Sequence, residues 1–382
     1  MIKALGKIKW KHYLNYIVIA LVTIFFAVKT FTTGINASDL YLLEKIAIAI
    51  TLAVSLSVVV GFLGELSLGH AGFMCIGAYL GGKASVLLEP IIKNDLLSLV
   101  ICVIVGGLVA AVCGMAIGMP ALRLRGDYLA IVTLAFGEIV RSVFMNSSDE
   151  SFGGSLGLST PRYDKKTLFI IAFVCVLFCL ATVQNLIRSK HGRAITSIRD
   201  NEIAARATGI NVTKYKLIVF TVSSFFAGVA GVLYSFSNYT VQSTKFSYNY
   251  SIEILVMVVL GGMGSINGSI IAATLITVLD VKLQTILTGD LAVLQDLFYA
   301  LVLIVLVIYN NAPALKNFRE KYNLKSVLGK VKKPRSLDPS RVHDDEAKWD
   351  RVPSKIKMDE VLSVDLQPSS PYTPDKAEKE EK

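Results

Sequence analysis

Several ionisable residues lie inside apolar stretches of this sequence, where a charge is costly and needs a reason. Glu138 and Arg141 stand three residues apart in "YLAIVTLAFGEIVRSVF", on one face of the expected helix. Glu65 and His70 flank a glycine-rich turn, and Glu253 begins a short apolar run. Such groups can relay protons or ions, as in a secondary transporter. They can also form structural pairs or face a cavity, and the sequence favours this second interpretation.

We find no motif for catalysis or metal binding in this sequence. It has no H-E-x-x-H pattern and no zinc-ligand spacing, and its five cysteines lie in apolar runs without a C-x-x-C pair. The segment 77–85, "GAYLGGKAS", resembles a phosphate-binding loop, but Ala84 replaces the required Ser or Thr and no strand precedes it. We therefore expect no ATP binding there, no catalytic residue, no cofactor and no metal.

The apolar runs that surround these residues predict an all-α, polytopic membrane bundle. Of the 382 residues, 53% are hydrophobic and only 18% are charged, and about 20 apolar residues form a helix that crosses ~30 Å of hydrocarbon. The run 250–262 is too short to span alone, so we expect a broken or re-entrant helix there. We expect about ten crossings, at 13–33, 40–62, 68–88, 96–118, 128–146, 167–187, 214–237, 250–262, 268–287 and 292–311.

Positive charge predicts the orientation of these crossings. Loops on the side of both termini carry 21 Lys and Arg near the membrane, and the other loops carry six. The positive-inside bias therefore places both termini in the cytoplasm. We expect a cytoplasmic N-terminus (1–12), a transmembrane domain (13–311) and a cytoplasmic tail (312–382) that is basic first and then disordered and charged. The net charge of +10 follows this placement, and no basic patch interleaved with aromatics indicates nucleic acid.

Glycines are concentrated in two stretches, "GFLGELSLGHAGFMCIGAYLGG" (61–82) and "LGGMGSINGSIIAA" (260–273). Small residues at four-residue spacing let helices approach closely. Alternatively, broken helices with glycine hinges line a translocation path. Under this second interpretation, the candidates for the path are Glu65, Ser67, Gly69, His70, Glu138, Glu253, Gly262, Gly264 and Ser265.

A charged segment, "GRAITSIRDNEIAARATGINVTKYKL" (192–217), interrupts the apolar runs. Asp200 or Ser197 can cap a helix that continues to about Thr208, and Gly209 suits the left-handed position after it. So short a helix is marginal alone and needs a surface. Lipid headgroups and a groove on a soluble partner are both open as that surface. In a groove on a partner, the buried side of the helix would consist of Ile198, Ile203, Ala204 and Ala205.

Five stretches together resemble one family, the M-type membrane permeases of ATP-driven importers for branched-chain amino acids. They are "GELSLGHAGFMCIGAYLG", "PALRLRGDYLAIVTLAFGEIVR", "GGSLGLSTP", the 192–217 segment and "VLGGMGSINGSIIAA", in family order. The likeness covers about residues 40 to 310. It implies that 190–213 is a cytoplasmic coupling segment that docks on an ATPase. The coupling residues that it implies are Asp200, Glu202, Ala204, Ala205 and Gly209.

The resemblance also implies partners and a location. The partners are two ATP-binding subunits, a second related permease or another copy of this chain, an extracytoplasmic binding protein, a small-molecule substrate and the lipid bilayer. The location is a bacterial cell membrane. Permeases for urea, short amides and sugars are similar, so these substrates stay open. Two other classes stay open as well: an ion-coupled transporter that uses Glu138, Arg141 and Glu253, and a membrane-anchored protein whose tail is the working part.

Overall fold

The computed structural model describes residues 14–32, 36–92, 94–124 and 126–286, together with 300, 301 and 304. The chain divides into two units, Met1–Asn310 and Asn311–Lys382, and all described residues belong to the first. The expected N-terminus (1–12) and tail (312–382) lie outside the described residues. So does the expected crossing at 292–311, apart from three positions.

Helices make up almost all of the described structure, which confirms the all-α prediction. The first group of elements is α2 (Leu14–Thr32), α3 (Ala37–Ser57), the π-helix η2 (Val58–Leu63), α4 (His70–Leu88), α5 (Asp95–Ala121), α6 (Asp127–Met145), α7 (Asp149–Phe152) and β1 (Leu158–Ser159). The second group is α8 (Lys165–Arg188), α9 (Lys190–Asp200), α10 (Glu202–Ala207), α11 (Val212–Asn238), β2 (Thr240–Val241), the 3₁₀-helix η3 (Ser243–Phe246), α12 (Tyr248–Gly261) and α13 (Ile266–Ile286).

Seven of these helices are long and apolar enough to cross a membrane, so the chain is a multi-pass membrane protein. They are Ala37–Leu63, which joins α3 to η2, and α4, α5, α6, α8, α11 and Ile266–Thr285 of α13. Two shorter apolar helices are Ile19–Thr30, within α2, and α12. The prediction of ten crossings is therefore not confirmed within the described residues.

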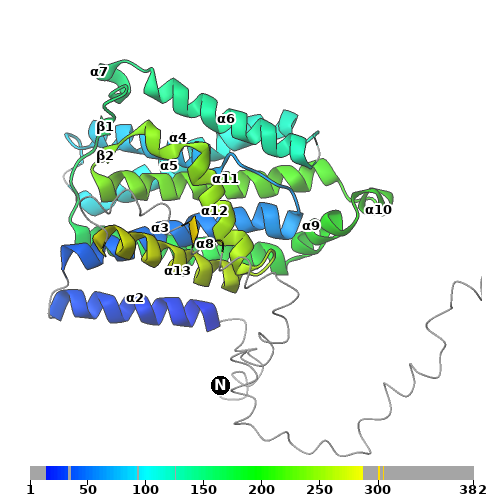
Figure 1. Ribbon diagram of the computed structural model, residues 1–382, viewed down its shortest axis with the longest axis horizontal. Helices are drawn as coiled ribbons and strands as arrows, with labels where there is room; N and C mark the ends of the chain where they lie inside the picture. Colours follow the sequence, from blue (N-terminus) through cyan, green and yellow to red (C-terminus); the bar gives the residue numbers. More distant parts are fainter. Residues whose placement is uncertain are drawn as a thin grey trace, which may run out of the picture. The chain divides into compact units, whose positions relative to one another are not determined.

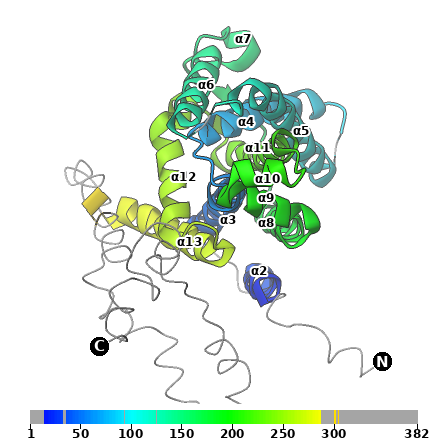
Figure 2. The same cartoon turned by 90° about the vertical axis from the view of Figure 1, so that its right-hand side faces the viewer.

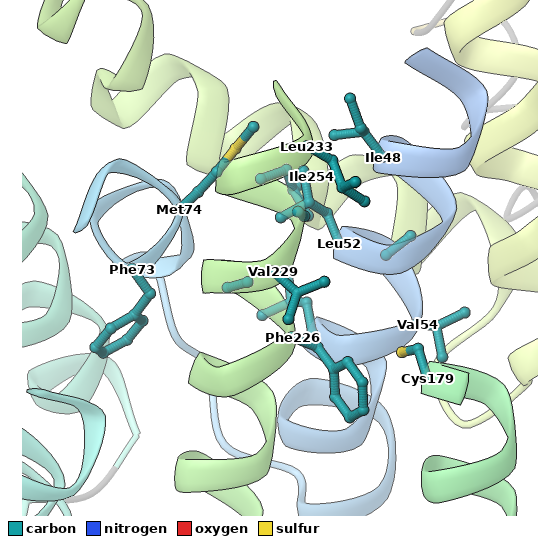
Figure 3. Close-up of a cluster of buried hydrophobic side chains, with 14 of the residues drawn as sticks. Ile48, Leu52, Val54, Phe73, Met74, Cys179, Phe226, Val229, Leu233 and Ile254 are labelled. Carbon is teal, nitrogen blue, oxygen red and sulfur yellow. The ribbon is translucent and has the colours of Figure 1, made fainter. Parts of the chain in front are cut away.

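Helix α11 lies at the centre of the bundle and packs against α3, α4, α5 and α8. In Figure 3 its side chains Phe226, Val229 and Leu233 stand between α4, which carries Met74, and α3, which carries Leu52. Glycine permits the close approach of α4: a Cβ on Gly77 would lie only 2.2 Å from the Gly228 carbonyl oxygen. The predicted tight packing through small residues is confirmed here.

Helix α12 runs across the bundle rather than along it. It is upright in both Figure 1 and Figure 2, while α2, α8 and α11 lie across the page in the first view and point at the viewer in the second. Its 14 residues reach about 21 Å at 1.5 Å per residue, less than the ~30 Å of hydrocarbon. It ends before Gly262, whose φ is +91°, and α13 begins at Ile266. The expected break in the helix is confirmed.

The two ends of the bundle differ in what they carry. Helices α9 and α10 lie at one end, here called the α10 end (Figure 1). The strands β1 and β2 lie near the other end, here called the β end. They form a two-residue antiparallel ladder that pairs Leu158 with Val241 and Ser159 with Thr240.

Candidate functional site

The charged segment at the α10 end forms two short helices that meet at Asn201. The Ser189 hydroxyl oxygen caps α9 by accepting from the backbone N–H of His191 at 3.1 Å. The Asn201 side chain caps α10 by accepting from the Ala204 N–H at 3.0 Å. The prediction that Asp200 or Ser197 caps the helix is wrong. Asp200 is the last residue of α9, and an extended residue, Asn201, is needed to turn the chain into α10.

Helix α10 ends at the predicted glycine. Gly209 has a φ of +84°, and no atom lies within 4 Å of the position that its Cβ would take. Its N–H donates to the Arg206 carbonyl, and the Ile210 N–H donates to the Ala205 carbonyl, both at 3.0 Å. This pair of bonds is a Schellman motif, which favours glycine at the left-handed position. The expectation for Gly209 is confirmed.

The apolar residues of this segment differ in exposure. Ile198 and Ala205 are 4% and 3% exposed because they pack into the bundle of this chain itself, so a partner's groove is not what buries them. Ile203 is 74% exposed, and Ala204 is exposed as well, so burial of both residues in a groove on a partner stays a prediction. Asn201 bends the chain and turns this edge of α10 away from the bundle.

A buried lysine connects α10 to the glycine-rich segment. The Lys216 ammonium forms an ion pair with Glu65 and a second one with Glu202, at 3.1 Å. Its side chain is 3% exposed. Glu202 also pairs with Arg206 at 2.7 Å, so two cations meet two carboxylates. Buried charges of this kind persist only when they are paired.

Lys216 is not among the residues predicted from the sequence, and Glu65 was predicted to line the path. The two residues are 151 positions apart, and no spacing rule connects them. The structure assigns Glu65 to the α10 end, in contact with Lys216.

Arg199 of α9 makes a second connection to the glycine-rich segment. It is not among the residues predicted from the sequence. Its Nη1 donates to the Gly61 carbonyl at 2.9 Å, and its aliphatic carbons cover Gly64. Gly61 in turn touches the break after α12: a Cβ on Gly61 would lie 2.5 Å from the Gly264 amide nitrogen. Helix α9, the end of the first long span and the α12–α13 joint therefore meet at one place.

Three path candidates lie in packed surroundings. Ser67 and His70 are each 2% exposed, and the His70 Nε2 lies 2.8 Å from the Ser55 hydroxyl. Gly69 packs on α6, where a Cβ would lie 2.6 Å from the Thr133 carbonyl oxygen. These residues hold the α3–α4 connection against the neighbouring helices.

Glu138 and Arg141 form the pair that their spacing predicted. The Arg141 Nε lies 2.8 Å from one carboxylate oxygen of Glu138. The other oxygen accepts from the N–H of Tyr248, the first residue of α12, at 2.9 Å. A carboxylate at a helix N-terminus is stabilised by the helix dipole, so Glu138 anchors α12 to α6.

The remaining path candidates lie within α12 and after its C-terminus. Glu253 lines a cavity of about 360 Å³ near the β end, here called the Lys45 cavity. Gly264 and Ser265 line a cavity of about 290 Å³ between η2, α8 and the α12–α13 joint, together with Gln184. Gly262 forms the joint itself.

Two further patterns do not form reactive sites. The segment 153–157 has the G-x-S-x-G spacing of a hydrolase nucleophile, but Ser155 lies in the turn between α7 and β1 rather than between a strand and a helix. Among the described residues, no three His, Cys, Asp or Glu are grouped to hold a metal ion. The five cysteines are free thiols within apolar helices.

Comparison with known proteins decides the family of this chain. A family model described as "Branched-chain amino acid transport system / permease component" matches residues 39–309. The chain belongs to this family. The match extends from α3 through α13 and thus includes the α10 end, the α12–α13 joint and both cavities.

Individual permeases agree with this membership. The chain is 38% identical over 263 residues to the high-affinity branched-chain amino acid transport system permease protein LivM of Salmonella typhimurium. It is 37% identical over 262 residues to LivM of Escherichia coli K12. Each match covers 60% of this chain and 60% of the relative, so the chain spans about three fifths of the length of these relatives.

A more distant permease relative has a different substrate in its name. The ribose import permease protein RbsC of Escherichia coli K12 is 26% identical over 246 residues, which cover 61% of this chain and 74% of the relative. No solved structure matches the chain significantly.

Proposed function

We propose that this chain is the permease subunit of an ATP-driven, binding-protein-dependent importer of branched-chain amino acids. Family membership and the names of the LivM relatives support the transport role and the substrate class. In this proposal the chain itself is not catalytic, and ATP is hydrolysed by partner subunits.

One observation supports the proposal most strongly. The exposed edge of α10 is connected, through side-chain contacts, to the glycine-rich segments at the end of η2 and between α12 and α13. Ile203 and Ala204 present an apolar surface at the α10 end. We assign this surface, with Asp200, Glu202, Ala205 and Gly209 supporting it, to docking on an ATP-binding subunit. Burial of Ile203, which is 74% exposed, in a groove on a partner would stabilise docking because water is excluded from the contact.

Movement of the docked segment would reach the membrane helices through two contacts. Arg199 holds the Gly61 carbonyl, and Lys216 joins Glu202 to Glu65. The first contact ends at the joint where Gly61 touches Gly264, and the second ends at Glu65 in the segment between η2 and α4. A ligand shifts a conformational equilibrium only through contacts that differ between the states. Docking on an ATPase that closes around ATP supplies that difference.

The assembly that we propose has two ATP-binding subunits, a second related permease or another copy of this chain, and an extracytoplasmic binding protein. The α10 end faces the cytoplasm of a bacterial cell, as the distribution of Lys and Arg indicates. The β end, with the loop 151–164, faces outward and receives the substrate.

The experiment that tests the proposal is uptake of labelled leucine into proteoliposomes that contain the complete importer. Uptake should require internal ATP, stop with a non-hydrolysable analogue, and be indifferent to excess urea. Dependence on ATP without transport of leucine would overturn the substrate class. Inhibition by urea would indicate a permease for urea or short amides.

The ion-coupled alternative makes a different prediction, namely that a protonophore stops uptake when ATP is plentiful. The contacts of Glu138 do not favour it. Both of its carboxylate oxygens are engaged, one by Arg141 and one by the Tyr248 N–H, whereas a relay needs a carboxylate that binds and releases protons. Uptake that follows an ion gradient and ignores ATP would contradict the docking role of α10.

A further inference from the structure

Three ionisable side chains from three apolar helices converge on the Lys45 cavity. Lys45 belongs to α3, Glu253 to α12 and Asp280 to α13. Placing one such group in a membrane helix is costly, and such groups usually face a cavity or a substrate pathway. Three from separate helices at one cavity indicate a site that binds something charged or strongly polar.

Aromatic residues form much of the remaining wall. Lys45 Nζ lies 5.3 Å from the ring centroid of Tyr41 and 5.7 Å from that of Tyr234. The Tyr234 ring contacts Phe246 edge to face at 5.4 Å. Cation–π contacts of this kind hold an ammonium in place without neutralising its charge.

Hydrogen bonds hold these rings in position. The Tyr41 hydroxyl donates to the Asn238 side-chain oxygen at 3.0 Å, and the Asn238 amide nitrogen donates to the Tyr234 carbonyl at 2.9 Å. The wall that carries Lys45 is therefore already shaped before any ligand arrives, which lowers the cost of binding.

Negatively charged residues also belong to the lining. Glu253 and Asp280 line the cavity, and both carboxylate oxygens of Asp280 accept from Gln284 Nε2 at 3.1 Å. Lys245 supplies a second cation. The lining therefore has two cations and two anions, and its complement is a ligand that carries both charges and an apolar part.

We propose that the Lys45 cavity binds the zwitterion of an aliphatic α-amino acid on its way through the permease. The substrate carboxylate faces Lys45, its ammonium faces Glu253 and Asp280, and its aliphatic side chain contacts the aromatic wall. A volume of about 360 Å³ lies within the ~300–1,000 Å³ typical of small-molecule sites. The inference rests on the proposed function for the direction and class of transport.

An adjoining cavity of about 570 Å³ offers an entrance. It shares Lys245, Tyr250 and Glu253 with the Lys45 cavity. A substrate that enters there meets one cation and one anion before it reaches Lys45 and Asp280.

The test is protection of a cysteine at the rim of the Lys45 cavity. In the assembled importer in nanodiscs, without binding protein, Gln284→Cys is labelled with a membrane-impermeant maleimide. Millimolar leucine should slow labelling at least threefold. Three other compounds should not slow labelling. They are leucinol, which lacks the carboxylate, isocaproate, which lacks the ammonium, and urea. Ser155→Cys, exposed in the turn after α7, is the matched control and should label at the same rate with every compound.

Charge variants in the Gln284→Cys background complete the test. Asp280→Asn, or Lys45→Gln where the first variant does not assemble, should raise the half-protecting concentration of leucine about tenfold or more, because each removes one charge-assisted contact. Equal protection by leucine, leucinol and isocaproate would overturn the inference, and so would unchanged protection in the charge variants.

The same preparation separates this inference from the proposed function. One outcome is that leucine is taken up after addition of binding protein and ATP, but leucine does not protect the cysteine. This outcome would overturn the proposed binding site and would leave the proposed importer function standing. Absence of ATP-dependent leucine uptake by the parent importer would overturn the proposed function itself.

Discussion

At the scale of single residues, Lys216 is the group on which the α10 end depends most. It is 3% exposed and pairs with carboxylates of the glycine-rich segment and of α10. Removing one partner of a buried ion pair costs about 3–5 kcal/mol because the other charges stay buried. Lys214 lies two residues earlier on the same helix and is exposed. Substituting Lys214 and Lys216 in turn therefore distinguishes the loss of a positive charge from the loss of a buried ion pair.

We expect Lys216→Met to reduce leucine uptake by the assembled importer at least tenfold while ATP hydrolysis continues, because α10 loses its contact with Glu65. Lys214→Met should stay within twofold of the parent protein. Uptake and hydrolysis are measured on equal amounts of purified complex. Restoration of uptake by the reversed pair Glu65→Lys with Lys216→Glu would exclude a general folding defect. Normal uptake in Lys216→Met would show that the ion pair transmits nothing.

At the scale of elements, α10 depends on how it ends. The φ of +84° at Gly209 and its N–H bond to Arg206 determine where α11 begins relative to the exposed Ile203. Proline has φ near −65° and no N–H, so it opposes both features. Alanine keeps the N–H, finds no atom within 4 Å of its Cβ and bears only the cost of a left-handed backbone, about 1–2 kcal/mol.

We therefore expect Gly209→Pro to abolish uptake and Gly209→Ala to retain most of it. Both proteins should insert into the membrane in normal amounts, because the apolar spans are unchanged. The measurement is leucine uptake per amount of inserted permease. Ala205→Glu, which places a charge at a position that is 3% exposed, should also abolish uptake. Full activity of the proline variant would rule out a docking role for α10.

At the scale of the whole molecule, the orientation of the α10 end and the β end across the membrane decides whether the proposed importer can work. We expect Ile203→Cys to react with an impermeant maleimide only from the cytoplasmic side, and Ser155→Cys only from outside. Both residues are exposed in this chain, so access depends on the side alone when the chain is expressed without its ATP-binding subunits. Labelling of intact cells and of inverted vesicles measures the side from which each cysteine is accessible. The reverse pattern would contradict the positive-inside assignment.

Features that depend on local chemistry could be predicted from the sequence. Runs of apolar residues specify membrane helices wherever they occur, because transfer into hydrocarbon is a property of the segment. Gly209 was predictable as a helix end because the left-handed conformation depends on the residue type. The break after α12 was predictable from a short apolar run followed by glycines.

Tertiary structure alone decided which distant groups meet. Lys216 and Glu65 are 151 residues apart, and the cavity residues Lys45, Glu253 and Asp280 come from three helices. The same holds for the crossing direction of α12 and for the outward turn of Ile203. A side chain's partner depends on how helices pack against one another. Packing is the combined result of many weak contacts, and no spacing along one chain segment encodes it.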